Sequence, residues 1–150
     1  MDANQLSQLI DRRLHLLQSL MEMGHKQTAA IRDGRMSDLM RILSEKQPPL
    51  SELAAIAQQL KAAAGDDPEK RIWPDPAARD RCRRHQQVCE QLHLDLLAME
   101  AECESTLSKS RDEIQQRLER VDSGRQVANS YARQAMPVTG GGTLDLSSDS

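Results

Sequence analysis

The residues of this sequence best suited to chemistry are two cysteines and two histidines in steps of three and four: Cys82, His85, Cys89 and His93. On a helix this spacing places all four near one face, and cysteine and histidine are the preferred ligands of zinc. Geometry argues against one site, because a helix rises about 16 Å from Cys82 to His93, while zinc ligands lie about 2.0–2.3 Å from the metal. We therefore expect no metal and no cofactor; the cysteines should pack in an apolar seam that the histidines flank.

Catalytic motifs are also missing from the sequence. It contains no Gly-x-x-x-x-Gly-Lys phosphate loop, no Gly-x-Ser-x-Gly elbow and no His-Glu-x-x-His zinc motif. A cysteine nucleophile beside His85 would stand on an open helix surface with no cleft to exclude water. Acidic residues such as Glu100, Glu102 and Glu104 fit a solvated helix face. We therefore expect a protein that is not an enzyme and has no catalytic residues.

A basic cluster surrounds the start of the last long helical pattern, and its members are Arg71, Arg79, Arg81, Arg83 and Arg84. Cations at a helix N-terminus oppose the helix dipole. The cluster fits either a docking patch for an acidic partner or a solubilising face with local ion pairs. The second interpretation pairs Asp75 with Arg79, and Asp80 with Arg83 or Arg84, at helical spacings of three and four.

The elements that would position these residues are helices, and one of them is very long. Between Pro76 and Pro137 the chain has no proline and only one glycine, Gly124. This predicts a helix over residues 76–134 of about 85 Å, whereas a compact globule of this size would have a radius of gyration of only about 15 Å. Its first half carries a dense seam: Cys89, Leu92, Leu96, Met99 and Cys103. The length predicts a rod, which suits a protein-binding function better than catalysis.

Two shorter helices are expected before it. Residues 3–31 carry a broad leucine stripe that Arg13 interrupts, and Asp33-Gly34 then gives a turn signal. Residues 35–63 form the second helix, whose leucine repeat Leu39, Leu53 and Leu60 is completed only if Lys46 takes the missing place. Pro48-Pro49 predicts a kink near residue 47, or a break with the prolines in the first turn of a restarted helix.

Residues 64–75 read as a loop. Within it, Ile72 and Trp73 should fold back onto the helices as an apolar plug. The alternative is that Trp73 is a binding hot spot for a partner. After the loop, Asp75-Pro76 is a good helix start, with a capping side chain followed by proline in the first turn.

Composition fixes the expected fold class. Apolar residues make up 38% of the chain, but aromatic residues only 1%, and leucine, alanine and methionine dominate. We predict an all-α fold: an elongated antiparallel helical bundle or coiled coil, with two or three shorter N-terminal helices packed on one long C-terminal helix. Residues 1–135 should form a single domain, and the Gly- and Ser-rich residues 136–150 a disordered tail.

Charge and hydropathy exclude several classes of function. A net charge of −3 argues against nucleic-acid binding. No segment is long and apolar enough to insert into a membrane, and the N-terminal residues do not read as a signal peptide. A cytoplasmic location is therefore expected.

The second half of the long helix carries the predicted partner-binding residues, which are Ile114, Leu118, Val121, Val127 and Tyr131. These residues continue the apolar stripe beyond the region that the preceding helices best match, and an uncovered stripe invites a partner helix. Two alternatives stay open: the preceding helices cover the stripe, or the chain forms a homodimer through it.

The layout resembles a known family. The run from Ala30 through Asp33-Gly34 to Met36, followed by Leu39, Leu43, Glu45-Lys46-Gln47, Leu50 and Leu53, is similar to the FlgN-type flagellar export chaperones. That family tends to show a leucine-rich first helix, a short turn, a second helix with a lysine near its middle, and a long last helix ending near a tyrosine. Tyr131 fits this layout. The Pro48-Pro49 pair departs from the family's uninterrupted second helix.

The resemblance implies a cytosolic chaperone for type III flagellar secretion. Such a protein binds helical C-terminal segments of hook–filament junction proteins and delivers them to the flagellar export apparatus. It implies no cofactor and no nucleotide. The alternatives from other classes are a structural coiled-coil protein or adaptor that oligomerises without an export client, and a metal-binding helical sensor.

Overall fold

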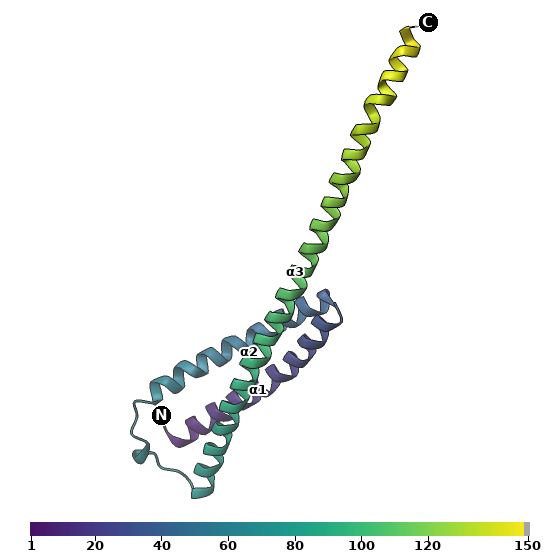
Figure 1. Cartoon of the computed structure of the whole chain (residues 1–150). Helices are drawn as coiled ribbons and strands as arrows, with labels where there is room; N and C mark the ends of the chain where they lie inside the picture. The colour runs from purple at the N-terminus through teal and green to yellow at the C-terminus, as the bar shows by residue number, and fades with distance from the viewer. Residues whose placement is uncertain (149–150) are drawn as a thin grey trace. The chain divides into compact units, whose positions relative to one another are not determined.

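The computed structural model describes the backbone of residues 1–148 and the side chains of residues 1–133. Helices α1 (Ala3–Arg32) and α2 (Met36–Ala63), the short 3-10 helix η1 (Pro68–Lys70) and helix α3 (Pro76–Ser148) follow in that order (Figure 1). No strand occurs over residues 1–148, and the predicted all-α class is confirmed. The chain divides into unit 1, residues 1–106, and unit 2, residues 107–150. The predicted disordered tail, residues 136–150, lies outside the residues whose side chains are described.

Local hydrogen bonds explain both ends of α1. The Asp2 carboxylate accepts from the Gln5 backbone N–H at 2.7 Å, and the Gln5 side chain accepts from the Asp2 N–H, which together form a capping box. At the other end, Gly34 adopts a φ of +70°, a conformation that favours glycine. The Arg35 N–H then reaches the Ala30 carbonyl at 2.9 Å, closing a Schellman motif. The Asp33-Gly34 turn is therefore the hinge of a helical hairpin.

Helix α2 runs without interruption through Pro48 and Pro49, so the break considered from the sequence does not occur. A kink near residue 47 stays a prediction. The two prolines remove the donors that would reach the carbonyls of Ser44 and Glu45. Both of these residues are exposed, so water can satisfy their carbonyls and the loss is small enough for the helix to continue.

In unit 1, α1 and α2 lie side by side as an antiparallel pair, and the first part of α3 packs against them (Figure 1). The centre of the core is formed by Leu17 and Leu20 of α1 with Cys89 and Leu96 of α3. These residues belong to the predicted seams, because spacings of three and four place side chains on one face. Two polar side chains are also buried in unit 1, Gln27 of α1 and Lys46 of α2. The Lys46 ammonium donates to the Gln27 side chain at 2.8 Å and to the Glu100 carboxylate.

Candidate functional site

The predicted partner-binding residues lie in unit 2, on the part of α3 that follows residue 106. Every residue from 111 to 133 is exposed. Five of them are large and apolar, with exposed fractions of 56% for Ile114, 60% for Leu118, 53% for Val121, 57% for Val127 and 71% for Tyr131. Apolar side chains repeated along an exposed helix mark a surface that a partner can cover.

These five residues occupy two faces of α3. Ile114, Leu118 and Val121 follow in steps of four and three, so they share one face. Val127 follows Val121 by six residues, which at about 100° per residue turns it roughly 120° away from that face. Tyr131, four residues after Val127, continues the second face, and both residues line a shallow depression with Gln126. In place of the single stripe expected from the sequence, the five residues therefore form two separate apolar faces of α3, roughly 120° apart.

The four cysteine and histidine residues are distributed around the α1–α3 contact. Cys82 and Cys89 are buried, and burial raises the pKa of both thiols. His85 is half-buried and pairs with Asp11 of α1, with 2.7 Å between His85 Nδ1 and the carboxylate, while His93 is exposed. Over the residues with described side chains, no three cysteine, histidine or acidic residues converge in a way that could hold a metal ion. The thiols act as small apolar core groups.

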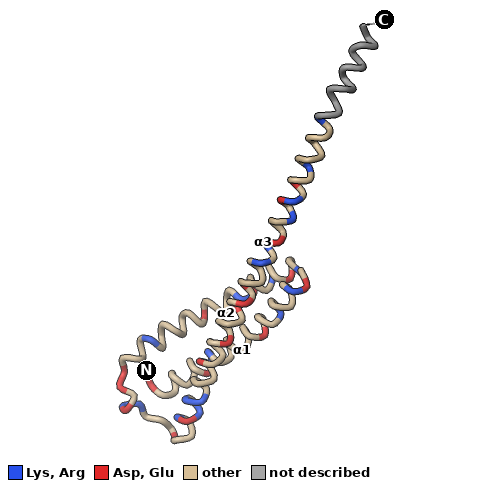
Figure 2. The backbone as a smooth tube through the Cα atoms, in the orientation of Figure 1, with Lys and Arg blue, Asp and Glu red and all other residues tan. Residues whose placement is uncertain are grey.

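The arginine cluster gathers at the start of α3, where Figure 2 shows several basic positions close together. The local ion pairs proposed for Arg79, Arg83 and Arg84 are not formed: within the described part of the chain, none of these guanidinium groups lies within 4 Å of a carboxylate. Asp75 instead caps α3, its carboxylate accepting from the Ala78 N–H at 2.6 Å. The solubilising interpretation loses its ion pairs, because Asp75 caps the helix and Asp80 pairs with neither Arg83 nor Arg84 within the described part of the chain.

The loop before α3 corrects one prediction. Ile72 is 89% exposed and so is no part of an apolar plug, whereas Trp73 is half-buried. The chain is extended at Arg71, and successive side chains of an extended chain point to opposite sides. Arg71 points inward, where its Nε donates to the Met1 carbonyl at 3.2 Å; Ile72 consequently points outward and Trp73 inward again.

Unit 1 carries an apolar groove that the sequence did not reveal. Its volume is about 520 Å³, and Leu43, Leu50 and Leu53 of α2 and Leu96 and Leu97 of α3 line much of it. Leu97 remains 54% exposed and Leu50 38% exposed. The available signal was the spacing of Leu43 and Leu50, which lie seven residues apart and therefore on one face of α2.

Comparison with known proteins identifies the family of this chain. The model described as FlgN protein matches residues 1–139. No curated protein and no solved structure matches the chain. Across the described residues, no helix has a stretch long and apolar enough to cross a bilayer.

Proteins of this family are cytoplasmic and non-enzymatic, and they chaperone the hook-associated junction proteins FlgK and FlgL. The matched region includes the helical hairpin, the Asp33-Gly34 turn and the exposed faces of α3 through Tyr131. With 139 of 150 residues matched, the chain belongs to the FlgN family of flagellar export chaperones.

Proposed function

We propose that this chaperone holds the helical C-terminal segments of junction proteins on the two exposed faces of α3, and delivers them to the flagellar export apparatus. The observation that carries the proposal is the unbroken exposure of residues 111–133, which include five large apolar side chains. An amphipathic helix of a client would cover these side chains with its own apolar face. While bound, the client would be shielded from premature assembly.

The arrangement of the faces favours a client that contacts α3 from two sides. A lone helix offers ridges and no groove, so one client helix can cover Ile114, Leu118 and Val121 while leaving Val127 and Tyr131 open. Two client helices flanking α3 would bury both faces. We therefore expect substitutions on either face to weaken binding, and substitutions on both to weaken it further.

The free energy gained by covering these five side chains is consistent with reversible binding of a client. Complete burial of a large apolar side chain contributes about 1.5–3 kcal/mol, and these five are already partly buried against their own helix. Covering the remaining area would contribute on the order of 5 kcal/mol before the entropic cost of association. Association costs several kcal/mol in lost freedom, so these five side chains alone give weak, reversible binding, and a stable complex needs further contacts between client and chaperone.

The groove of unit 1 is a second apolar surface, and it fits a client helix less well. Its rim contains Lys46 and Glu100, which already bind each other, together with Arg13 and His93. An apolar client helix placed there would remove the exposed parts of Glu100, Arg13 and His93 from water without offering new partners. On unit 2, Ile114, Leu118 and Val121 are exposed along an open helix, where a long charged neighbour such as Arg117 can still extend its head group to water.

Light scattering tests the class of function directly. The protein is measured alone and with a C-terminal segment of a hook–filament junction protein. A chaperone gives one heterocomplex of defined mass. A structural coiled-coil protein self-associates through the same apolar faces, as a homodimer or larger, and its mass does not change when the segment is added. The second result would contradict the proposal.

A further inference from the structure

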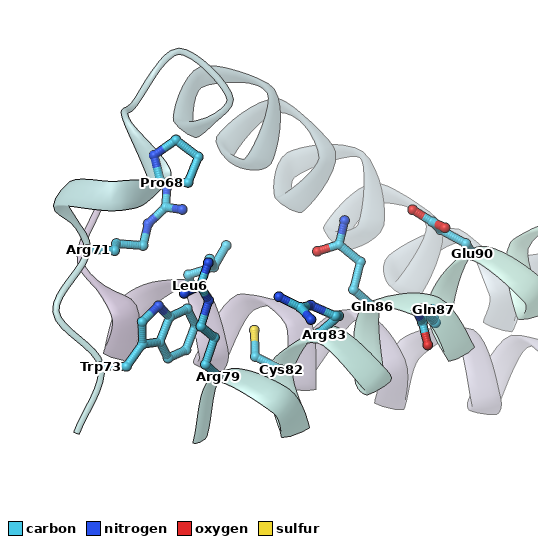
Figure 3. A pocket seen from close by; sticks show the side chains of 10 residues that line it. All are labelled: Leu6, Pro68, Arg71, Trp73, Arg79, Cys82, Arg83, Gln86, Gln87 and Glu90. Carbon is cyan, nitrogen blue, oxygen red and sulfur yellow. The ribbon is translucent and has the colours of Figure 1, made fainter. Parts of the chain in front are cut away.

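A second cavity of unit 1 has no part in the client site. It measures about 340 Å³ and lies where α1, η1, the following loop and the start of α3 meet (Figure 3). Leu6, Pro68 and Trp73 give it apolar walls. The α3 side is formed by residues at alternating steps of three and one, which share one side of the helix: Arg79, Cys82, Arg83, Gln86, Gln87 and Glu90.

Three guanidinium groups converge on this cavity, those of Arg71, Arg79 and Arg83 (Figure 3). Arg71 is held in place by the Met1 carbonyl at 3.2 Å and lies 3.8 Å from the Asp66 carboxylate. Arg79 and Arg83 have no acidic partner within 4 Å among the residues with described side chains. The cavity therefore presents two guanidinium forks that are free to bind carboxylates, a geometry that suits bidentate pairing.

The other wall groups select the kind of anion. The side-chain amides of Gln86 and Gln87 can both donate and accept, as a peptide backbone requires. Trp73 and Leu6 offer apolar area for a neighbouring side chain. Glu90, at the far end of the lining, would repel a polyphosphate but can accept a peptide N–H. A nucleic acid is also disfavoured, because the lining has no lysine and the whole chain carries a net charge of −3.

We propose that this cavity binds an acidic peptide segment of a partner protein. A carboxylate of the segment lies between Arg79 and Arg83, and an adjacent apolar side chain packs against Trp73 and Leu6. The site is separate from the client faces of α3, so the protein can hold a client and a second partner through different residues. Buried Cys82 forms part of the cavity wall.

The chain carries its own probe for this site, because Trp73 is its only tryptophan. Trp73 fluorescence is followed while the full-length protein is titrated with the peptide acetyl-Glu-Leu-Asp-Glu-Leu-Asp-amide. The matched control peptide has glutamine and asparagine in place of the acids, and inorganic phosphate serves as a simple anion. The test variant is Arg79→Gln/Arg83→Gln; its control, Arg117→Gln/Arg120→Gln, removes the same charge from exposed positions of unit 2.

The proposal expects a saturable fluorescence change with the acidic peptide below about 1 mM, corresponding to a binding free energy of about −4 kcal/mol. Added salt should weaken it, because ion pairs at an open cavity are screened. The affinity should fall at least about tenfold in Arg79→Gln/Arg83→Gln and stay unchanged in the control variant.

Three results would overturn the proposal. The first is the absence of a saturable change with the acidic peptide. The second is an equal response of the wild type to the neutral peptide, or an equal response of the Arg79→Gln/Arg83→Gln variant to the acidic peptide. The third is saturation by phosphate alone at the same concentration, which would identify a general anion site. Circular dichroism of each variant confirms that the fold is retained, and client binding by Arg79→Gln/Arg83→Gln should match that of the wild type.

Discussion

The ammonium group of Lys46 on α2 binds the carboxylate of Glu100 on α3, and the two residues differ in their access to water. The Lys46 side chain is 5% exposed, whereas that of Glu100 is 38% exposed. Gln27 of α1 contacts both, accepting from Lys46 at 2.8 Å and donating to Glu100 at 3.4 Å. One polar network therefore joins the three helices of unit 1 at a single level.

This asymmetry predicts unequal costs for removing either partner. Glu100→Ala leaves a buried ammonium with only Gln27 as its partner and should lower the free energy of unfolding by about 3 kcal/mol. Lys46→Met retains the apolar stem, and Glu100 can turn to water, so the loss should stay below about 1.5 kcal/mol. Urea unfolding followed by circular dichroism measures both. Equal losses, or a larger loss for Lys46→Met, would contradict this account of the pair.

A close approach between α1 and α3 gives a second prediction. A Cβ atom added at Gly24 would overlap with Met99 Sδ, so Met99 must move to accommodate it. Gly24→Ala should therefore destabilise the protein by about 1 kcal/mol, although alanine is the better helix former. In a Met99→Ala background the same substitution should stabilise it. A double-mutant cycle measures this coupling, and equal effects of Gly24→Ala in both backgrounds would exclude the contact.

The pairing of Arg12 with Glu52 across α1 and α2 predicts a pH dependence. Arg12 donates to Glu52 through two nitrogens, at 2.6 and 2.8 Å, and this lowers the pKa of Glu52. Because the folded pKa lies below the unfolded value of about 4.5, the stabilisation is complete above pH 4.5 and is lost as the pH falls through the folded pKa.

Glu52→Gln should therefore flatten the loss of stability on acidification. The measurement is the urea midpoint at a series of pH values from 7 down to about 3, where a carboxylate of lowered pKa becomes protonated. Glu104→Gln is the matched control, since Glu104 is exposed and has no ion pair within the described part of the chain. A Glu52→Gln profile that falls as steeply as that of the wild type would refute the prediction.

Much of unit 1 could be predicted from periodicity, and the exceptions have physical causes. The Cys89–Leu96 seam was predictable because residues three and four apart share a helix face. The sequence also placed Lys46 in a leucine position. The partner of Lys46 could not be predicted from the sequence, because Glu100 lies 54 residues further along the chain and contacts Lys46 only once α2 and α3 pack together.

The loop and the arginine cluster show the same limit. The outward turn of Ile72 depends on Arg71 reaching the Met1 carbonyl, a contact across 70 residues. Helical spacing favoured an ion pair between Asp75 and Arg79. The Asp75 carboxylate instead accepts a hydrogen bond from the Ala78 N–H, which has no partner within the first turn of α3. Spacing along one helix indicates which residues can meet, and competing partners decide which ones do.

The central claim is that junction-protein clients bind the exposed apolar faces of α3 after residue 106. Isothermal titration of a junction-protein C-terminal segment into Leu118→Asp/Val121→Asp tests it most directly. Leu94→Asp/Leu97→Asp is the matched control, because these leucines of α3 are 60% and 54% exposed, close to the 60% and 53% of Leu118 and Val121. All four residues are more than half exposed, so both variants should fold.

We predict that the client affinity falls at least about tenfold, or 1.4 kcal/mol, in Leu118→Asp/Val121→Asp, and stays near the wild-type value in Leu94→Asp/Leu97→Asp. Unchanged affinity in the first variant would contradict the claim, and a loss confined to the second would place the client on unit 1 beside Leu97, which lines its groove.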